Sequence, residues 1–193
     1  MPKSKSGAKA QPLAIELLMA DHRKVEDLFE QYEGEKESDD ATKRRIANKI
    51  CAELTVHAQV EEEIFYPWLR ENLDDDDMEM LEEAQVEHNG AKDLIAQIEA
   101  AGDVDATYDA MVKVLSEYIK HHVKEEENEI FPAVSSEKEE LDALGQEMTS
   151  RKEELAEELG LSDDDDDGED DGEGSAKSGR GKSQSGESNQ RGR

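Results

Sequence analysis

The feature that most constrains this chain is a repeat of apolar residues at steps of three and four, which continues through four consecutive segments. The segments lie near residues 12–34, 40–66, 76–101 and 104–131. This spacing places the apolar side chains on one side of an α-helix and the charged residues on the other. Short breaks separate the segments, at 34–40, 67–77 and 102–105. Long helices with short connections predict an all-α, antiparallel up-down-up-down four-helix bundle.

The two ends of the chain lack the apolar residues that a packed element needs. Residues 1–11 are small and basic, and no large apolar side chain follows Ser162, so neither end can offset the entropy of ordering. Leucines recur at helical spacing once more, which predicts a fifth helix at about 136–159. We therefore expect a disordered segment 1–11, a bundle domain 12–134, a C-terminal helix within 135–160 and a disordered tail 161–193.

The net charge of the chain is strongly negative, at −29 from 52 acidic and 23 basic residues. Such a surface repels phosphates, so we expect no nucleic-acid partner. The sequence contains no apolar run long enough to cross a membrane, and Glu16 and Asp21 interrupt the stretch that would form a signal peptide, so we expect a cytoplasmic protein without a membrane partner. The tail is acidic and then rich in Gly, Ser and basic residues; it either keeps the chain soluble or docks a basic protein partner.

Each of the four expected helices places a histidine where its apolar stripe should continue: His22, His57, His88 and His122. Two of the helices add a glutamate four residues later on the same face, Glu61 and Glu126. A single buried histidine is commonplace, but buried glutamates need a partner or a shifted pKa. Bound cations would satisfy all six side chains together. Imidazole and carboxylate ligands suit iron, manganese or zinc.

An internal repeat supports this set of ligands. Both halves of the bundle contain an acid-His pair followed after four residues by Asp-Leu, at Asp21-His22 and Glu87-His88. Both also contain His-x-x-x-Glu with a proline ten residues after the histidine, Pro67 or Pro132. The two equivalent halves predict two metal ions, one in each half, with glutamates able to bridge them. Alignment on the prolines selects His122 over its neighbour His121, which is expected to lie outside the first ligand set.

The ordered set His22, His57-x-x-x-Glu61, His88, His122-x-x-x-Glu126, with Phe65-Tyr66-Pro67 and Phe131-Pro132 following, resembles the haemerythrin-like family, also called the HHE cation-binding domain. The resemblance covers about residues 12–134. It implies two iron ions per chain, bridged by carboxylates and an oxo or hydroxo group, with manganese or zinc as alternatives. It also implies a protein that binds or responds to O2, NO or peroxide, or buffers iron, in stress defence.

One departure from the family's oxygen carriers bears on the function. Those proteins have a second histidine four residues after the first on the third helix, where this chain has Lys92. Glu62 or Glu87 could replace that ligand, and Tyr118 could donate a hydrogen bond near the centre or lie with its hydroxyl in solvent. A more open site favours peroxide chemistry or sensing over oxygen transport. The alternatives are a di-iron peroxidase or ferroxidase, or an acidic partner protein with a structural metal, and the sequence does not separate binding from catalysis.

Overall fold

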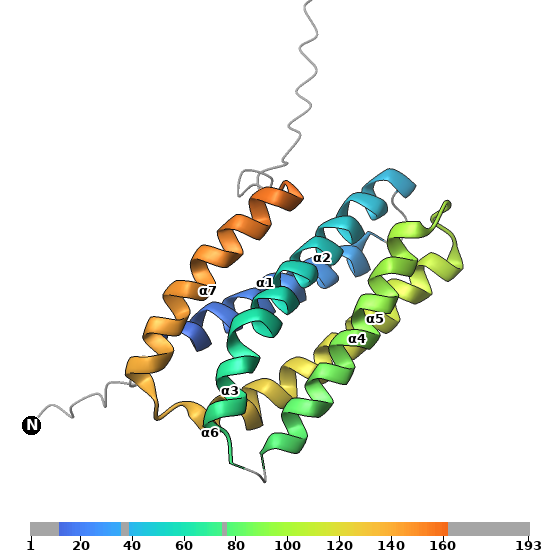
Figure 1. Cartoon of the computed structure of the whole chain (residues 1–193). Coiled ribbons are helices and arrows are strands. Elements are labelled where there is room, and N and C mark those ends of the chain that lie inside the picture. The colour runs from blue at the N-terminus through green and yellow to red at the C-terminus, as the bar shows by residue number, and fades with distance from the viewer. Residues whose placement is uncertain (1–11, 36–38, 75–76, 162–193) are drawn as a thin grey trace, which may run out of the picture. The chain divides into compact units, whose positions relative to one another are not determined.

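The architecture is a helical bundle, seen in a computed structural model that describes residues 12–35, 39–74 and 77–161 (Figure 1). Seven α-helices and two π-helical turns make up these ranges, and no strand occurs within them. The elements are α1 (Leu13–Gly34), α2 (Asp40–Val60), η1 (Glu61–Phe65), α3 (Tyr66–Asn72), α4 (Met78–Ala100), α5 (Ala106–Glu125), η2 (Glu126–Ile130), α6 (Phe131–Val134) and α7 (Lys138–Leu159). The expected disordered segments 1–11 and 161–193 lie outside the described residues, except for Leu161.

Four long helices form the bundle, and their neighbours in space follow the order of the chain. The contacts join α1 to α2, α2 to α4, α4 to α5 and α5 back to α1, which closes a four-sided arrangement. The fifth helix, α7, packs against α1 and α2 on the outside of the bundle (Figure 1). The predicted all-α four-helix bundle with an additional C-terminal helix is therefore confirmed.

Aspartates start two of the bundle helices. Asp39 precedes α2 and its side chain accepts hydrogen bonds from the backbone N–H groups of Ala41 and Thr42. Asp105 does the same for Thr107 and Tyr108 at the start of α5. Each carboxylate satisfies two N–H groups that have no partner within the helix and favourably faces the positive end of the helix dipole.

The expected end of the second helix at Pro67 is wrong, because a π-helical turn carries the helix past this proline. In η1 the backbone N–H of Tyr66 donates to the carbonyl of Glu61, five residues earlier, and η2 repeats this bond between Phe131 and Glu126. A proline inside a regular helix lacks an N–H and clashes with the carbonyl four residues before it. The wider turn accommodates both prolines, so the helix continues to Asn72.

The buried apolar residues form two clusters, and the four core histidines lie near the level at which these clusters meet. On α1, for example, Leu18 belongs to one cluster, Val25 belongs to the other, and His22 lies between them. On α5, Ile119 and Val123 belong to one cluster, and Ile130 in the following turn belongs to the other. The polar layer is therefore enclosed at both ends by apolar packing, which limits the access of water.

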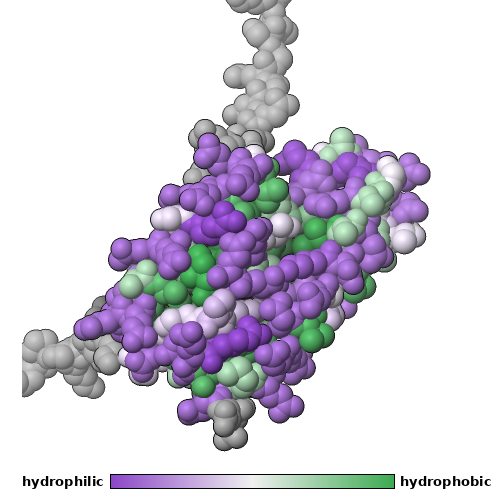
Figure 2. All heavy atoms as spheres, in the orientation of Figure 1, coloured by the Kyte–Doolittle hydropathy of each residue, from purple (hydrophilic) through white to green (hydrophobic). Residues whose placement is uncertain are grey.

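Figure 2 shows a mostly hydrophilic face, with hydrophobic side chains appearing between the helices. This agrees with the amphipathic pattern of each segment. Among the described residues, no helix is both long and apolar enough to span a membrane.

At Gly145 the backbone of α7 lies very close to the start of α1. A Cβ atom added there would lie 2.5 Å from the backbone nitrogen of Ala14 and 2.8 Å from the carbonyl carbon of Leu13. Backbone atoms cannot move aside as a flexible side chain can. We therefore expect Gly145→Ala to lower the free energy of unfolding by about 1–3 kcal/mol, as overpacking does. Urea denaturation would measure this.

Gly34 provides the matched control, because a Cβ at this position on α1 meets nothing within 4 Å. Gly34→Ala should leave stability unchanged or raise it slightly, because alanine loses less conformational entropy on folding. If Gly145→Ala stabilised the protein as much as Gly34→Ala did, the close contact between α7 and α1 would be contradicted.

Candidate metal centre

The bundle core contains one histidine from each long helix, and two glutamates. His22 lies on α1, His57 on α2, His88 on α4 and His122 on α5, and all four are buried. Glu61 and Glu126 begin the two π-helical turns and are 0% exposed. The structure thus brings together all six residues predicted from the sequence.

The six side chains form two groups of potential metal ligands that share one carboxylate. His22, His57, Glu61 and Glu126 make up the first group, and Glu61, His88 and His122 the second. In each group the nearest nitrogen and oxygen atoms lie within 4.8 Å of one another. Glu61 belongs to both groups and is therefore placed to bridge two cations.

Each glutamate reaches histidines from both halves of the bundle. The Oε2 atom of Glu61 lies 3.2 Å from His57 Nε2 and 3.3 Å from His88 Nε2. The Oε2 atom of Glu126 lies 3.2 Å from His22 Nε2, and its Oε1 atom lies 3.5 Å from His122 Nε2. The two halves of the internal repeat therefore meet through their carboxylates, with the four Nε2 atoms directed inward.

Several of these inward atoms have no hydrogen-bond partner, although they are fully buried. They are both carboxylate oxygens of Glu61, the Oε2 atom of Glu126 and the Nε2 atom of His22. Short contacts surround them, but none has the geometry of a hydrogen bond. Buried polar atoms without partners are costly, and a cation that accepts their lone pairs would satisfy them together. Imidazole nitrogen and carboxylate oxygen are ligands for iron, manganese or zinc, so the donor set fits a bound metal.

The pKa shifts of the buried groups also indicate a site that favours a bound cation. Burial and the negative charge of Glu126 raise the pKa of the Glu61 carboxyl to about 8. Burial opposes ionisation of Glu126 as well, but the charges of His122 and His22 outweigh it and hold the pKa of that carboxyl well below its usual range. Two facing carboxylates cannot both ionise easily unless a cation lies between them.

The histidines of the second group differ from each other in the same way. Burial and the nearby charge of His122 lower the pKa of His88 to about 4. Burial also disfavours the charged form of His122, but the carboxylates of Glu126 and Glu87 outweigh this effect and raise its pKa to about 9. A metal ion binds the neutral imidazole, so a metal ion bound at His122 would displace a proton.

The outward Nδ1 atom of each histidine faces a carboxylate from another helix or turn. The pairs are His22 with Glu127 at 2.9 Å, His57 with Asp21 at 3.6 Å, His88 with Glu62 at 3.0 Å and His122 with Glu87 at 2.9 Å. Such partners fix the orientation of a metal-binding imidazole and leave Nε2 for the metal. Glu62 and Glu87, considered above as substitute ligands, therefore lie behind the histidines and do not face the core.

Tyr66 is a residue of the site that the sequence reasoning did not assign. It is fully buried, and its hydroxyl lies 3.2 Å from His88 Nε2 and donates to Glu126 Oε1 at 3.2 Å. In a regular helix, five residues at about 100° each would direct Tyr66 roughly 140° away from Glu61. The π-helical turn η1 brings both onto the core side. Phe131 takes the equivalent place in the other half, stacked on His22 with ring centroids 6.0 Å apart.

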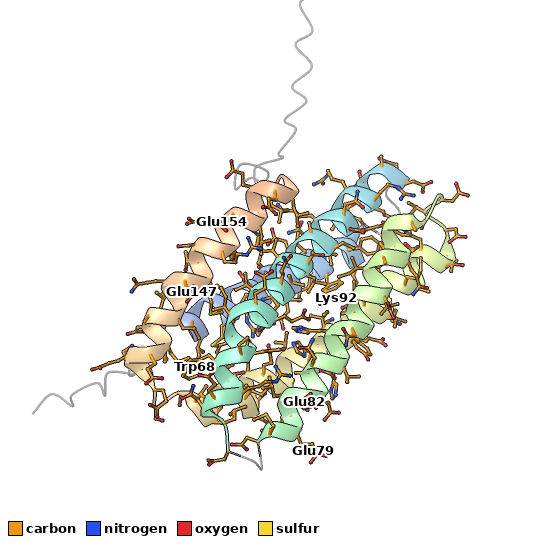
Figure 3. The ribbon with its side chains drawn as sticks, viewed as in Figure 1. Trp68, Glu79, Glu82, Lys92, Glu147 and Glu154 are labelled. Atoms are coloured by element: carbon orange, nitrogen blue, oxygen red, sulfur yellow. The ribbon has the colours of Figure 1, made fainter. Side chains whose placement is uncertain are left out.

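The other residues that the sequence singled out lie outside the cluster of six. His121 is 57% exposed and pairs with Glu87 and Glu125, whereas His122 is buried. Lys92 projects from α4 (Figure 3) and forms an ion pair with Glu62. It therefore holds in place the carboxylate that faces His88. Tyr118 is 38% exposed and its ring lies over Gly90, which agrees with the alternative of a hydroxyl near solvent.

A small cavity of about 20 Å³ adjoins the histidines. All four core histidines contribute to its wall, and the rest of the wall is mainly apolar, including Val25, Leu54, Ala91, Ile95 and Ile119. A cavity of this size holds about one water-sized molecule.

The fold and the site define a metal-binding four-helix bundle. The chain belongs to the haemerythrin family, since residues 13–134 match the family described as Hemerythrin HHE cation binding domain. A protein of Nostoc sp. (strain PCC 7120) named DNA nickase is 28% identical over 158 residues, a match that covers 80% of this chain and 43% of that protein. No solved structure matches the chain significantly.

Proposed function

We propose that this chain holds two iron ions at His22, His57, Glu61, His88, His122 and Glu126, and binds or responds to O2, NO or peroxide, or buffers iron, in stress defence. The observation that most directly supports this proposal is the pair of buried groups of potential ligands that share Glu61. His22, His57 and Glu126 would hold the first ion, His88 and His122 would hold the second, and Glu61 would be shared by the two groups. Two adjacent irons would supply electrons for exchange with a small oxidant.

The residues around the centre favour a small ligand over a large substrate. The cavity beside the histidines is about 20 Å³ and mainly apolar, so it suits a diatomic molecule or peroxide. Leu54 and Val25 in its wall exclude bulk water, and the carboxylates hydrogen-bonded to His22, His88 and His122 keep those three imidazoles in place.

The test is metal analysis and optical spectroscopy of protein purified without oxygen and then exposed to air. The proposal expects two irons per chain and an absorption change on exposure to air. Turnover of peroxide or of ferrous iron, measured on the same samples, separates a binding protein from a peroxidase or ferroxidase. A preparation with zinc alone, and with no spectral response to O2, NO or peroxide, would contradict the proposal and favour a structural metal.

Tyr66 is expected to support the second ion, because its hydroxyl lies between His88 and Glu126. Tyr66→Phe removes only that hydroxyl and keeps the ring that stacks on His88 at 5.2 Å. We expect the affinity for one of the two ions to fall by roughly 10–100-fold, as it does when a supporting partner is lost. Competition with a chelator of known affinity would measure this.

Tyr108→Phe is the matched control. Tyr108 is also fully buried, but it packs in the other of the two apolar clusters, the one to which Tyr66 does not belong. It should bind both ions as the wild type does. Equal affinities in Tyr66→Phe and Tyr108→Phe would remove Tyr66 from the site.

The name of the Nostoc relative describes an activity on DNA, but this chain covers less than half of that protein. The net charge of −29 opposes association with a polyanion. We therefore do not extend the proposal to nucleic acid.

A further inference from the structure

The four carboxylates behind the core histidines differ in what lies on their outer side. Three of them pair with a lysine or an arginine: Glu127 with Arg23, Asp21 with Lys152 and Glu62 with Lys92. Each carboxylate thus faces a histidine on one side and a permanent positive charge on the other. This arrangement balances the negative charge near the centre.

Glu87, the fourth carboxylate, lacks such a cation. Its Oε2 atom lies 2.9 Å from His122 Nδ1, so Glu87 faces its histidine as the other three carboxylates face theirs. Its Oε1 atom lies 3.5 Å from His121 Nε2, and the same nitrogen lies 3.2 Å from Glu125 Oε1. Within the described ranges, no lysine or arginine forms an ion pair with Glu87 or Glu125. Two carboxylates therefore converge on one exposed imidazole.

The internal repeat explains why only Glu87 differs. Its counterpart in the first half, Asp21, is covered by Lys152 from α7, and α7 packs against α1 and α2. The positions equivalent to His121 and Glu125 are Val56 and Val60, which are buried. At the place where the first half has apolar residues and a lysine, the second half therefore presents an imidazole and a carboxylate at the surface.

The three side chains have the chemistry of a divalent metal site. His121 and Glu125 lie four residues apart on α5, which places them one above the other on the same face. Glu87 approaches from α4, and the three potential ligand atoms lie within 4.8 Å of one another. One imidazole and two carboxylates suit a first-row transition metal, and the exposure of His121 leaves room for water as a further ligand.

We propose that Glu87, His121 and Glu125 form a second, surface-exposed cation site for a divalent transition-metal ion. The bound ion supplies the positive charge that Arg23, Lys152 and Lys92 supply behind the other three histidines. Because Glu87 contacts this ion through one oxygen and His122 through the other, the exposed site is one carboxylate away from the buried centre. The strongly negative chain raises the local concentration of such cations.

Equilibrium dialysis against Zn²⁺ tests the site on full-length protein, with the iron content of every sample measured in parallel. His121→Ala and Glu125→Gln each remove one ligand and spare the residues of the buried centre. We expect the wild type to bind one zinc ion per chain that both variants bind at least roughly 10-fold more weakly. His121→Lys places a lysine beside Glu87, as a lysine or an arginine lies beside each of the other three carboxylates. This variant should abolish the binding of the same zinc ion while preserving the fold.

Glu117→Gln is the matched control, because it removes the same charge from an exposed position on the same helix. It should bind zinc as the wild type does. Identical zinc binding by the wild type and His121→Ala would overturn the proposal, and so would equal weakening by Glu117→Gln and Glu125→Gln, which would indicate diffuse attraction. Absence of iron from all samples would contradict the proposed function, whereas the comparison of zinc binding would still decide this site.

Discussion

Glu61→Ala is expected to reduce the metal content of the purified protein from two ions per chain to less than one. Glu61 is the residue common to both ligand groups, and its carboxylate lies between His57 and His88. Its removal leaves the first group with three ligands and the second with two histidines. Because both ions lose the same bridging ligand, the effect should exceed that of removing any single histidine. Elemental analysis of protein expressed with ample iron would measure it.

The control for Glu61→Ala is Glu63→Ala, two residues later in the same turn. Glu63 is at the surface, where it pairs with Arg151 of α7, so its loss should leave the metal content unchanged. Circular dichroism should show the same helix content in both variants. The fold should tolerate Glu61→Ala, because the variant removes a buried carboxylate that faces Glu126. A Glu61→Ala protein that retained two ions per chain would contradict the shared-ligand arrangement.

The position of the candidate centre followed from the sequence because its four histidines lie on regular α-helix and its two glutamates lie at the first position of the π-helical turns. Four histidines fell on apolar stripes, and the spacing of His57 to Glu61 and of His122 to Glu126 placed each pair on one face. The internal repeat separated His122 from His121, which the structure places in the core and at the surface, respectively. Periodicity was sufficient wherever the helix kept its ordinary geometry.

Two features of the site were not predictable in this way. The π-helical turn after Glu61 turns Tyr66 into the core, and a count of 3.6 residues per turn directs that side chain elsewhere. The ion pair between Asp21 and Lys152 depends on where α7 packs against the bundle, because the two residues are 131 positions apart in the sequence. Amphipathicity predicts that α7 needs a partner surface, but it does not say which side of the bundle provides it.

Removal of the metal is expected to lower the melting temperature of the bundle by roughly 10 °C while preserving its helix content. A ligand that binds only the folded state at about 1,000 times its dissociation constant stabilises it by about 4 kcal/mol, and each kcal/mol shifts the melting temperature of a domain of this size by about 2–4 °C. The two apolar clusters on either side of the centre do not depend on the metal, so the helices should persist. Thermal melts followed by circular dichroism, before and after chelation, would measure both quantities.

Glu61→Ala protein makes this measurement specific to the buried centre. It should already melt at the temperature of the metal-free wild type, and chelation should change it little. His121→Ala protein should respond to chelation as fully as the wild type does, because His121 lies outside the core. An unchanged melting temperature in chelated wild-type protein would mean that the buried carboxylates and imidazoles satisfy one another without a cation. The unpartnered oxygens of Glu61, enclosed between the apolar clusters, argue for the opposite result.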